Sequence, residues 1–380
     1  MAESTSSPTP VPKVNDDIPS FKAHLANSNR IIAIIGAGLS AASGVATFRD
    51  KTSPWATYDS FMISSPAGWK RDPGLVWQFY SSRRREALLA KPNAAHYALV
   101  DLAKRKEGFT ALSQNVDGLL ERAGLEIRDH DGKSAGEENN SGQLIRLHGD
   151  LFSLVCAGGC GYVEHDNVDD PVYGCRVLAE EAIKERMARV HILGADMDLG
   201  KKPPKVSALL FEGIALKNKR ILGEEKFREA NPTVGDAKSL RDVQDRKGKN
   251  EEIGKEVGAK GGGETLALHS GIDKSELPQC PGCKKDLLRP GVVWFGESIS
   301  EKIILETDEI LDKSDGIDLC VVIGTSSQVW PAAGFCERAR AKGARVAWVN
   351  TRIEDCKSRR EDDWVFLGDA GEVVARILEP

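Results

Sequence analysis

The 380-residue sequence lacks any apolar run of the about 18 residues or more that a membrane-spanning helix needs. Its first residues have neither the apolar core of a signal peptide nor an Arg-rich amphipathic helix. There is no excess of positive charge, because the formal net charge is −5. These absences argue against a membrane or a nucleic acid as partner. They favour the cytosol or the nucleus, with the mitochondrion as the alternative, and a monomer is the default expectation.

Cysteine is also scarce, since eight cysteines are too few for a disulfide scaffold in a chain of this length. Four of them nevertheless form two close pairs, Cys156 with Cys160 and Cys280 with Cys283. Four thiolates suit tetrahedral Zn²⁺, and four protein ligands leave no open position, so such a zinc ion would be structural. Four unrelated thiols are the alternative interpretation, and Cys175 is an alternative ligand.

Short apolar runs predict buried strands at the start of 30–44, 109–120 and 319–335, each followed by a polar turn, and a further strand at 344–350. Helical patterns such as AAHYALVDLAKRK lie between them. Strands that alternate with helices predict the α/β class, with a Rossmann-like, doubly wound parallel sheet covered on both faces. Cys320 and Cys336 lie in apolar parts of this pattern and are expected in the core. Sheets of this kind bind ligands at the carboxyl ends of their strands.

Residues 151–285 interrupt this alternation and contain both cysteine pairs, which predicts an inserted small zinc module. Within it, about 201–270 is rich in charge and poor in apolar residues, a composition typical of disorder. The larger domain would comprise 29–150 and 286–380, after a flexible N-terminal arm over 1–28.

The segment from Gly36 through Gly38 to Ala41 fits the G-x-G-x-x-G/A pattern of dinucleotide-binding turns in its alanine form. Glycine permits a tight turn and a close approach of the backbone to a pyrophosphate. An ordinary strand-to-helix turn is the alternative, because no acidic residue follows on a second strand at the usual spacing.

Several motifs follow one another in the order found in sirtuins: GAGLSAASGVATFR, QNVD, LHG, the paired cysteines, RPGVVWFGE, GTSSQVWPAA and VNTR. On these motifs the chain resembles the sirtuin (Sir2) family of NAD-dependent protein deacylases over roughly 30–160 and 278–375. The resemblance implies a large Rossmann-like domain, a small module with one structural Zn²⁺, and NAD as cofactor. It also implies acyl-lysine proteins or peptides as partners, which meet NAD in a cleft between the two parts. The segment 50–55 departs from the family's Gly-rich continuation, so the geometry of this cofactor loop stays open.

The resemblance also implies roles for individual residues. In sirtuin-like chemistry the amide oxygen of an acyl-lysine displaces nicotinamide from NAD, and His148 would be the general base that takes a proton from the ribose hydroxyls. The peptide would add as a strand along Val293, Phe295, Gly296 and Val329. The residues implied in NAD binding are Gly36, Ala37, Gly38, Ser40, Ala41, Phe48, Arg49, Gln114, Asn115, Asp117, Gly324, Thr325, Ser326, Asn350, Thr351 and Ala370.

Tyr80 and Arg83 are three residues apart and would share one face of a helix. This pair resembles the signature of class III sirtuins, which remove succinyl, malonyl and glutaryl groups. A guanidinium holds a carboxylate by two charge-assisted hydrogen bonds, and a phenol adds a third. Arg84 and Arg85 are expected to be solvated, and a solvated Arg83 is the alternative interpretation.

Three other functions compete with removal of acidic acyl groups. They are a generic NAD-dependent deacetylase, a mono-ADP-ribosyltransferase, and a weakly active NAD-sensing module in which the altered loop at 50–55 fails to close. The presence of Gln114, Asn115 and His148 together argues against the last of these.

Overall fold

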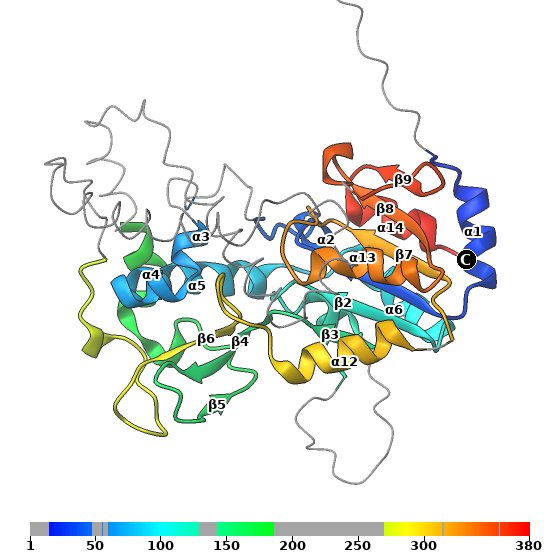
Figure 1. Ribbon diagram of the computed structural model, residues 1–380. Coiled ribbons are helices and arrows are strands. Elements are labelled where there is room, and N and C mark those ends of the chain that lie inside the picture. Colours follow the sequence, from blue (N-terminus) through cyan, green and yellow to red (C-terminus); the bar gives the residue numbers. More distant parts are fainter. Residues whose placement is uncertain are drawn as a thin grey trace, which may run out of the picture. The chain divides into compact units, whose positions relative to one another are not determined.

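A computed structural model describes residues 15–47, 55, 60–128, 143–185, 270–313, 315–356 and 358–380 (Figure 1). The expected disorder at 201–270 lies outside these residues except for Ser270. The chain divides into two compact units. Unit 1 consists of Met1–Asp50, Glu86–Asp150 and Ile299–Pro380, and unit 2 consists of Lys51–Arg85 and Leu151–Ser298. This division differs from the boundaries expected from the sequence, because residues 51–85 group with the cysteine-bearing segment.

Unit 1 contains a six-stranded parallel sheet in the order β3-β2-β1-β7-β8-β9 (Figure 1). The winding reverses between β1 and β7, as in other doubly wound sheets. The strands are β1 Ile31–Ile35, β2 Phe109–Ser113, β3 Leu144–Arg146, β7 Leu319–Ile323, β8 Arg345–Asn350 and β9 Trp364–Leu367. The predicted sheet is confirmed, and β3 and β9 are two strands that the apolar runs did not indicate.

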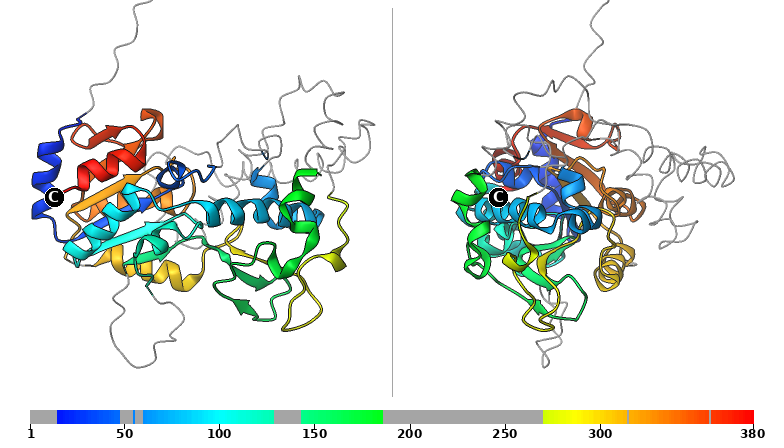
Figure 2. Two further views of the ribbon diagram at one scale, coloured as in Figure 1. Left: turned by 180° about the vertical axis from the view of Figure 1, so that it is seen from behind. Right: turned by 90° about the vertical axis from the view of Figure 1, so that its left-hand side faces the viewer.

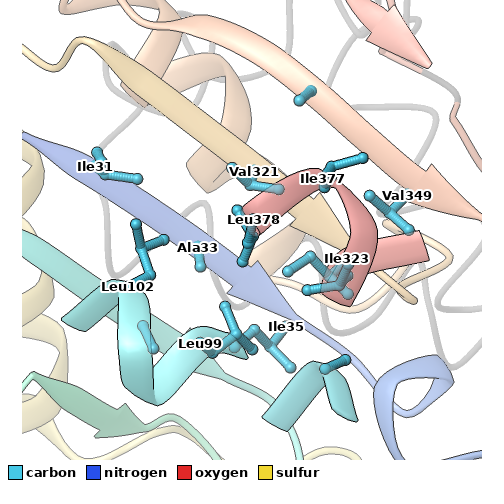
Figure 3. Packing of buried hydrophobic residues seen from close by; sticks show 14 of the residues in the cluster. Ile31, Ala33, Ile35, Leu99, Leu102, Val321, Ile323, Val349, Ile377 and Leu378 are labelled. Atoms are coloured by element: carbon cyan, nitrogen blue, oxygen red, sulfur yellow. The ribbon is translucent and has the colours of Figure 1, made fainter. Parts of the chain in front are cut away.

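Side chains from successive residues of β1 enter two different hydrophobic clusters, one on each face of the sheet. Ile31, Ala33 and Ile35 belong to the first cluster, whereas Ile32 and Ile34 belong to the second. Figure 3 shows the first cluster, in which Leu99 and Ile377 from two helices pack with the strand residues. Because both faces are covered, β1 is apolar at every position instead of alternating.

Figures 1 and 2 show the helices of unit 1 around the sheet. Each of them contributes buried residues to one of the two clusters. Those that supply buried residues to the first cluster are α1 Ile18–Asn27, α2 Gly38–Ala41, α6 Ala94–Arg105, α7 Leu119–Ala123 and α14 Ala370–Leu378. Those of the second cluster are α12 Glu301–Asp312 and α13 Ala332–Ala341. A short 3-10 turn, η5, spans Ile353–Asp355. None of the described helices combines the length and apolar character that crossing a bilayer requires. Cys320 and Cys336 are buried in the second cluster, as expected.

The expected flexible arm over 1–28 is wrong for residues 18–27, which form helix α1. Phe21 of α1 is fully buried, and its ring lies edge-on to Trp364 and to Phe366, at a centroid distance of 5.4 Å from each. The side chain of Asp17 caps the helix by accepting a hydrogen bond from the Ser20 N–H. The cap and the buried aromatic face hold this segment against the sheet.

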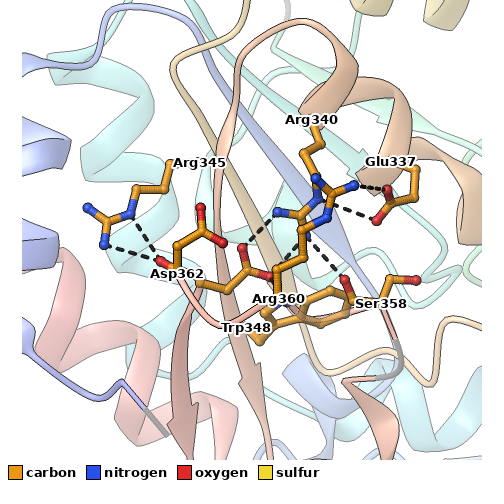
Figure 4. A network of polar contacts seen from close by, with 8 residues as sticks. Glu337, Arg340, Arg345, Trp348, Ser358, Arg360 and Asp362 are labelled. Atoms are coloured by element: carbon orange, nitrogen blue, oxygen red, sulfur yellow. Dashed lines mark hydrogen bonds and ion pairs between the residues drawn. The ribbon is translucent and has the colours of Figure 1, made fainter.

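A buried ion pair ties α13 to the turn between β8 and β9 (Figure 4). Arg340 donates two hydrogen bonds to the Asp363 carboxylate, at 2.7 and 2.9 Å. The same carboxylate accepts from the Trp348 indole at 3.0 Å and from the Arg360 backbone N–H at 2.9 Å. The carboxylate therefore has partners for all its buried lone pairs, which is the condition under which a buried charge is tolerated.

Unit 2 contains a three-stranded sheet in the order β5-β4-β6, with β6 at its edge. Its elements are β4 Gly149–Cys156, β5 Val163–Glu164, β6 Leu288–Val292, α3 Ser60–Ile63, α4 Pro66–Arg71, α5 Pro73–Leu89, and the 3-10 turns η1 Val172–Gly174, η2 Arg176–Leu178 and η4 Lys274–Glu276. Trp77 of α5 is fully buried among Leu154, Leu178 and Leu288, and its indole donates to the Leu288 carbonyl at 2.9 Å. Helix α5 is thus part of the core of this unit.

The expected solvation of Arg84 and Arg85 is wrong. Arg84 is 1% exposed, and its guanidinium donates to the carbonyls of Leu151, Asn167 and Asp169 and to the Asn167 side chain. Arg85 forms a two-bond ion pair with Asp170 at 2.7 and 2.8 Å. The acceptors lie at least 67 positions away in the sequence, so helical spacing alone could not indicate them.

Unit 1 also contains a buried histidine whose protonation is coupled to folding. His96 accepts a hydrogen bond from the Asn93 N–H through Nδ1, and Asn93 caps α6 in return. Burial, followed by the nearby Arg122, lowers the His96 pKa from 6.5 to about 4. The folded chain keeps this ring neutral, whereas the unfolded chain protonates it as the pH falls below 6.5.

We expect acidification from pH 7 to pH 5 to reduce the free energy of unfolding by about 2 kcal/mol more in the wild type than in His96→Gln. Glutamine preserves an acceptor at this capping position but does not titrate. Denaturant unfolding of both proteins at the two pH values measures the difference. Equal losses in both proteins would contradict the role of His96.

Candidate functional site

Two glycine turns meet at the carboxyl ends of β1 and β7, where the winding of the sheet reverses. The Gly38 N–H donates to the Gly324 carbonyl at 2.8 Å, and the Gly36 N–H donates to the Ile323 carbonyl at 2.9 Å. A Cβ atom on Gly38 would lie 2.6 Å from the Gly324 Cα, and Gly324 itself has a φ of +58°. Glycine is therefore required on both sides of this approach. The site lies where doubly wound sheets bind ligands.

Polar side chains from four strand ends form hydrogen bonds with one another around these turns. Gln114, after β2, donates to the Thr325 hydroxyl at 3.1 Å. Asn115 donates to the Ser40 hydroxyl at 3.2 Å, and Asn350 at the end of β8 donates to the Thr325 carbonyl at 3.1 Å. Amides and hydroxyls in this arrangement suit the sugar hydroxyls and phosphate oxygens of a dinucleotide.

His148 lies in the two-residue link between β3 and β4 and belongs to the same group of residues. Its Nδ1 atom lies 3.1 Å from the Gln114 carbonyl oxygen. Since a carbonyl only accepts hydrogen bonds, Nδ1 carries the proton and Nε2 presents a lone pair. Burial lowers the His148 pKa below 6.5, against a smaller raising effect of the hydrogen bond to Gln114. The ring is therefore a neutral base at neutral pH.

Asp117 is the buried acid of this group. It is 6% exposed, and burial raises its pKa above the ordinary value, partly offset by the hydrogen bond from the Leu119 N–H and by Ser40 and Arg122. Its Oδ1 accepts from Leu119 at 2.9 Å, which also fixes the start of α7.

The remaining residues expected to bind NAD differ in their exposure and in their position in the fold. Ala37 precedes α2 and Ala41 ends it, Ser326 is half-buried in the turn after β7, and Thr351 is exposed after β8. Ala370 is 3% exposed and belongs to the hydrophobic core. Phe48 and Arg49 lie outside the described residues.

In unit 2, Tyr80 and Arg83 lie on α5 and are 3% and 8% exposed. The Tyr80 ring stacks on Trp294 with a centroid distance of 6.3 Å. Burial raises the pKa of Tyr80 to about 12, so the phenol keeps its proton and remains a donor. The Arg83 guanidinium lies over the Phe79 ring at 5.3 Å.

The expected peptide-binding run leaves the sheet where β6 ends at Val292. Val293 and Phe295 are half-buried and Gly296 is exposed with a φ of +92°. Glu297 fixes this turn, because it accepts from the Trp294 N–H at 2.9 Å and from Nη1 and Nη2 of Arg289. Val329 belongs to unit 1 and is half-buried. Its carbonyl accepts a hydrogen bond from the Ala333 N–H.

The four predicted zinc ligands come together in unit 2. Their sulfur atoms all lie within 4.8 Å of one another, with 3.8 Å between Cys156 and Cys283 and 3.6 Å between Cys160 and Cys280. Four sulfur atoms that bind Zn²⁺ at about 2.3 Å stand about 3.8 Å apart at the corners of a tetrahedron. The donor set therefore fits one structural zinc ion. Cys175 lies outside this cluster and donates to the Glu276 carbonyl, so it is not an alternative ligand.

Two residues near the expected site, Ser64 and Asn93, do not belong to any of the sequence motifs described above. Ser64 sits beside Tyr80, and Asn93 links the start of α6 to the Leu39 carbonyl of the glycine turn at 2.9 Å. Asn93 could have been noticed as an N-cap before an apolar periodic run. Ser64 has no such pattern around it.

Comparisons with known proteins identify the family of the chain. A model of the Sir2 family matches residues 36–177 and 260–331. An NAD-dependent protein deacylase of Candida albicans is 34% identical over 372 residues, which covers 97% of this chain and 98% of the relative. The mitochondrial NAD-dependent protein deacylase sirtuin-5 of Xenopus tropicalis is 29% identical over 366 residues, or 95% of this chain and 84% of the relative.

Among solved structures, a Sir2 homologue in complex with NAD has the same fold, with a TM-score of 0.58 and 22% identity. The match covers 96% of this chain and 94% of that chain. The chain belongs to the Sir2 family.

The cysteine cluster yields a test of the metal. We expect Cys280→Ser to lose bound zinc and to unfold at a lower temperature, because metal binding and folding are coupled in such modules. Cys175→Ser is the matched control and should retain zinc, since its thiol lies outside the cluster. Metal analysis and thermal denaturation of both variants decide the point. Full zinc content in Cys280→Ser would rule out the assignment.

Proposed function

We propose that this chain uses NAD to remove acidic acyl groups, namely succinyl, malonyl and glutaryl, from protein lysines. The products would be nicotinamide, O-acyl-ADP-ribose and free lysine, with one water consumed. The general activity of an NAD-dependent protein deacylase rests on the family and on full-length relatives of that name. The acyl preference is the finer step, and the burial of Tyr80 and Arg83 on α5 is the observation that carries it.

Unit 1 would hold NAD at the two glycine turns. Bound there, NAD supplies an electrophilic ribose carbon that releases nicotinamide. Gln114, Asn115 and Asn350 would orient the sugars and the carboxamide, since each already has its side chain fixed by a hydrogen bond within the group. Prearranged polar groups of this kind lose little freedom when a ligand binds.

His148 would act as the general base. Its Nδ1 proton is held by the Gln114 carbonyl, which leaves Nε2 as the atom that accepts a proton from a ribose hydroxyl. A buried and neutral imidazole suits this step, because protonation before the reaction would remove the lone pair.

Tyr80 and Arg83 of unit 2 would bind the carboxylate of the acyl group. A guanidinium and a neutral phenol that share a helical face can donate three hydrogen bonds to one carboxylate. An acetyl group offers no carboxylate, so it could form none of these charge-assisted hydrogen bonds. The cost of that loss favours acidic acyl groups over acetyl.

The generic deacetylase remains the second candidate. Its support is that the family and relatives establish a protein deacylase but do not specify the acyl group. The two candidates differ in the part played by Arg83, which the following experiment isolates.

We expect the wild-type protein to hydrolyse succinyl-lysine and malonyl-lysine peptides faster than an acetyl-lysine peptide, and only with NAD. Arg83→Met should reduce kcat/KM for the succinyl peptide by about 100-fold and leave the acetyl value within a few-fold. Arg85→Met is the matched control, since this arginine is on the same helix but is paired with Asp170. Acetyl turnover at or above succinyl turnover in the wild type would disprove the acyl preference. Equal losses on both peptides in Arg83→Met would make Arg83 structural.

A second test concerns His148. His148→Ala should reduce kcat by about 100-fold or more while NAD binding, measured by calorimetry, changes little. The acid limb of the wild-type kcat/KM profile should lie below pH 6.5, because burial lowers the pKa of this base. An acid limb above pH 6.5, or a variant with nearly full turnover, would exclude His148 as the base.

A further inference from the structure

The side-chain amide of Asn93 forms hydrogen bonds through both of its polar atoms, and the two atoms serve different helices of unit 1. Its Oδ1 caps α6 by accepting from the N–H groups of Ala95 at 3.0 Å and His96 at 3.4 Å. Its Nδ2 donates to the Leu39 carbonyl at 2.9 Å and to the Ser43 hydroxyl at 3.1 Å. Capping requires only the oxygen. The two bonds of the nitrogen therefore serve something other than α6.

Both acceptors belong to the segment that follows the first glycine turn. Leu39 lies in α2, a helix of only four residues, and Ser43 lies in the turn after it. A helix this short leaves the carbonyls of its end without partners inside the helix. Asn93 provides a donor to one of these carbonyls. The Leu39 side chain is fully buried in the first hydrophobic cluster, so this residue is held by apolar packing and, through its carbonyl, by Asn93.

The first turn of α14 packs against the same point. A Cβ atom on Gly371 would lie 2.7 Å from the Ala42 Cβ and 3.5 Å from the Asn93 Cγ. The Gly371 N–H donates to the Asp369 carboxylate at 2.7 Å, which fixes the start of α14. The end of α2, the start of α6 and the start of α14 thus meet at the Asn93 amide, and this close packing confines its nitrogen to the α2 segment.

The neighbours of Leu39 on either side belong to the group of residues expected to bind NAD. Gly38 precedes it, and the Gly38 N–H donates to the Gly324 carbonyl at 2.8 Å, which joins the two glycine turns. Ser40 follows it, and the Ser40 hydroxyl accepts from Asn115 at 3.2 Å. A shift of the Leu39 backbone would therefore disturb both the approach of the two turns and the hydrogen bond that orients Asn115.

We propose that Asn93 is a positioning residue for NAD, because its Nδ2 fixes the α2 segment while its Oδ1 caps α6. This inference rests on the part of the proposed function that places NAD at the glycine turns. Both polar atoms of the Asn93 side chain already bind protein groups, so Asn93 would not contact NAD and takes no part in a bond-making step. Without the Nδ2 bonds the α2 segment gains freedom that NAD binding must then remove, so the effect falls on NAD affinity.

Asn93→Ser separates the two roles, because serine caps a helix about as well as asparagine but lacks the amide nitrogen that reaches Leu39 and Ser43. We expect this variant to bind NAD about 10-fold more weakly in calorimetry without peptide, and to raise KM for NAD by a similar factor. KM for the acyl-lysine peptide and kcat should stay within about two-fold. Asn93→Ala also loses the cap, so it should melt about 2 °C or more below Asn93→Ser and yet bind NAD equally weakly.

Two further variants separate positioning from general loss of stability and from misplacement of NAD. Asp17→Ala removes the N-cap of another unit 1 helix, α1, and should lower the melting temperature while NAD affinity stays within about two-fold.

The inference is wrong if Asn93→Ser binds NAD as tightly as the wild type, or if Asp17→Ala weakens NAD binding to the same extent as Asn93→Ser. Asn115→Ala tests the placement of NAD itself. If Asn115→Ala weakens NAD binding and Asn93→Ser does not, only the present inference fails. If neither variant weakens it, the placement of NAD at the glycine turns fails as well.

Discussion

The close approach of the Gly38 turn to Gly324 is the constraint on which unit 1 depends. The two turns share a backbone hydrogen bond of 2.8 Å, and no side chain beyond hydrogen fits between them. This contact joins β1 to β7 at the switch point and brings Thr325 within reach of Gln114. Gln114 in turn sets the tautomer of His148 through its carbonyl. A backbone contact thus fixes the orientation of a side chain that belongs to another strand end.

Unit 2 is built around helix α5, and the helix is held by groups that look like surface residues in the sequence. Arg84 binds the backbone carbonyl of Leu151 in β4 and the carbonyls of Asn167 and Asp169 after β5. Trp77 packs beside the cysteine cluster. These contacts fix the rotation of the helix about its axis. The same rotation buries Tyr80 and Arg83. The core around the cysteine cluster and the two residues proposed to bind the acyl group therefore depend on one helix.

Local patterns were sufficient for the sheet strands with strong apolar runs, because burial on both faces leaves a continuous β-branched signal. They were insufficient for β3, only three residues long, and for α1, whose burial depends on Trp364 more than 330 positions later. Cysteine spacing predicted the four clustered sulfur atoms because zinc ligands commonly occur as closely spaced cysteine pairs. No spacing rule could exclude Cys175, whose thiol turns to the Glu276 carbonyl.

The sequence by itself determined the family, the doubly wound sheet, the four thiolate ligands and the positions of the glycine turns, because each is encoded within a few neighbouring residues. Only the tertiary structure decided which of three consecutive arginines is buried by backbone carbonyls and which is paired with an aspartate. It also decided that Ser64 and Trp294 lie beside the buried Tyr80 phenol. The physical reason is that burial and hydrogen bonding depend on distances between segments far apart in the chain, and those distances exist only after folding.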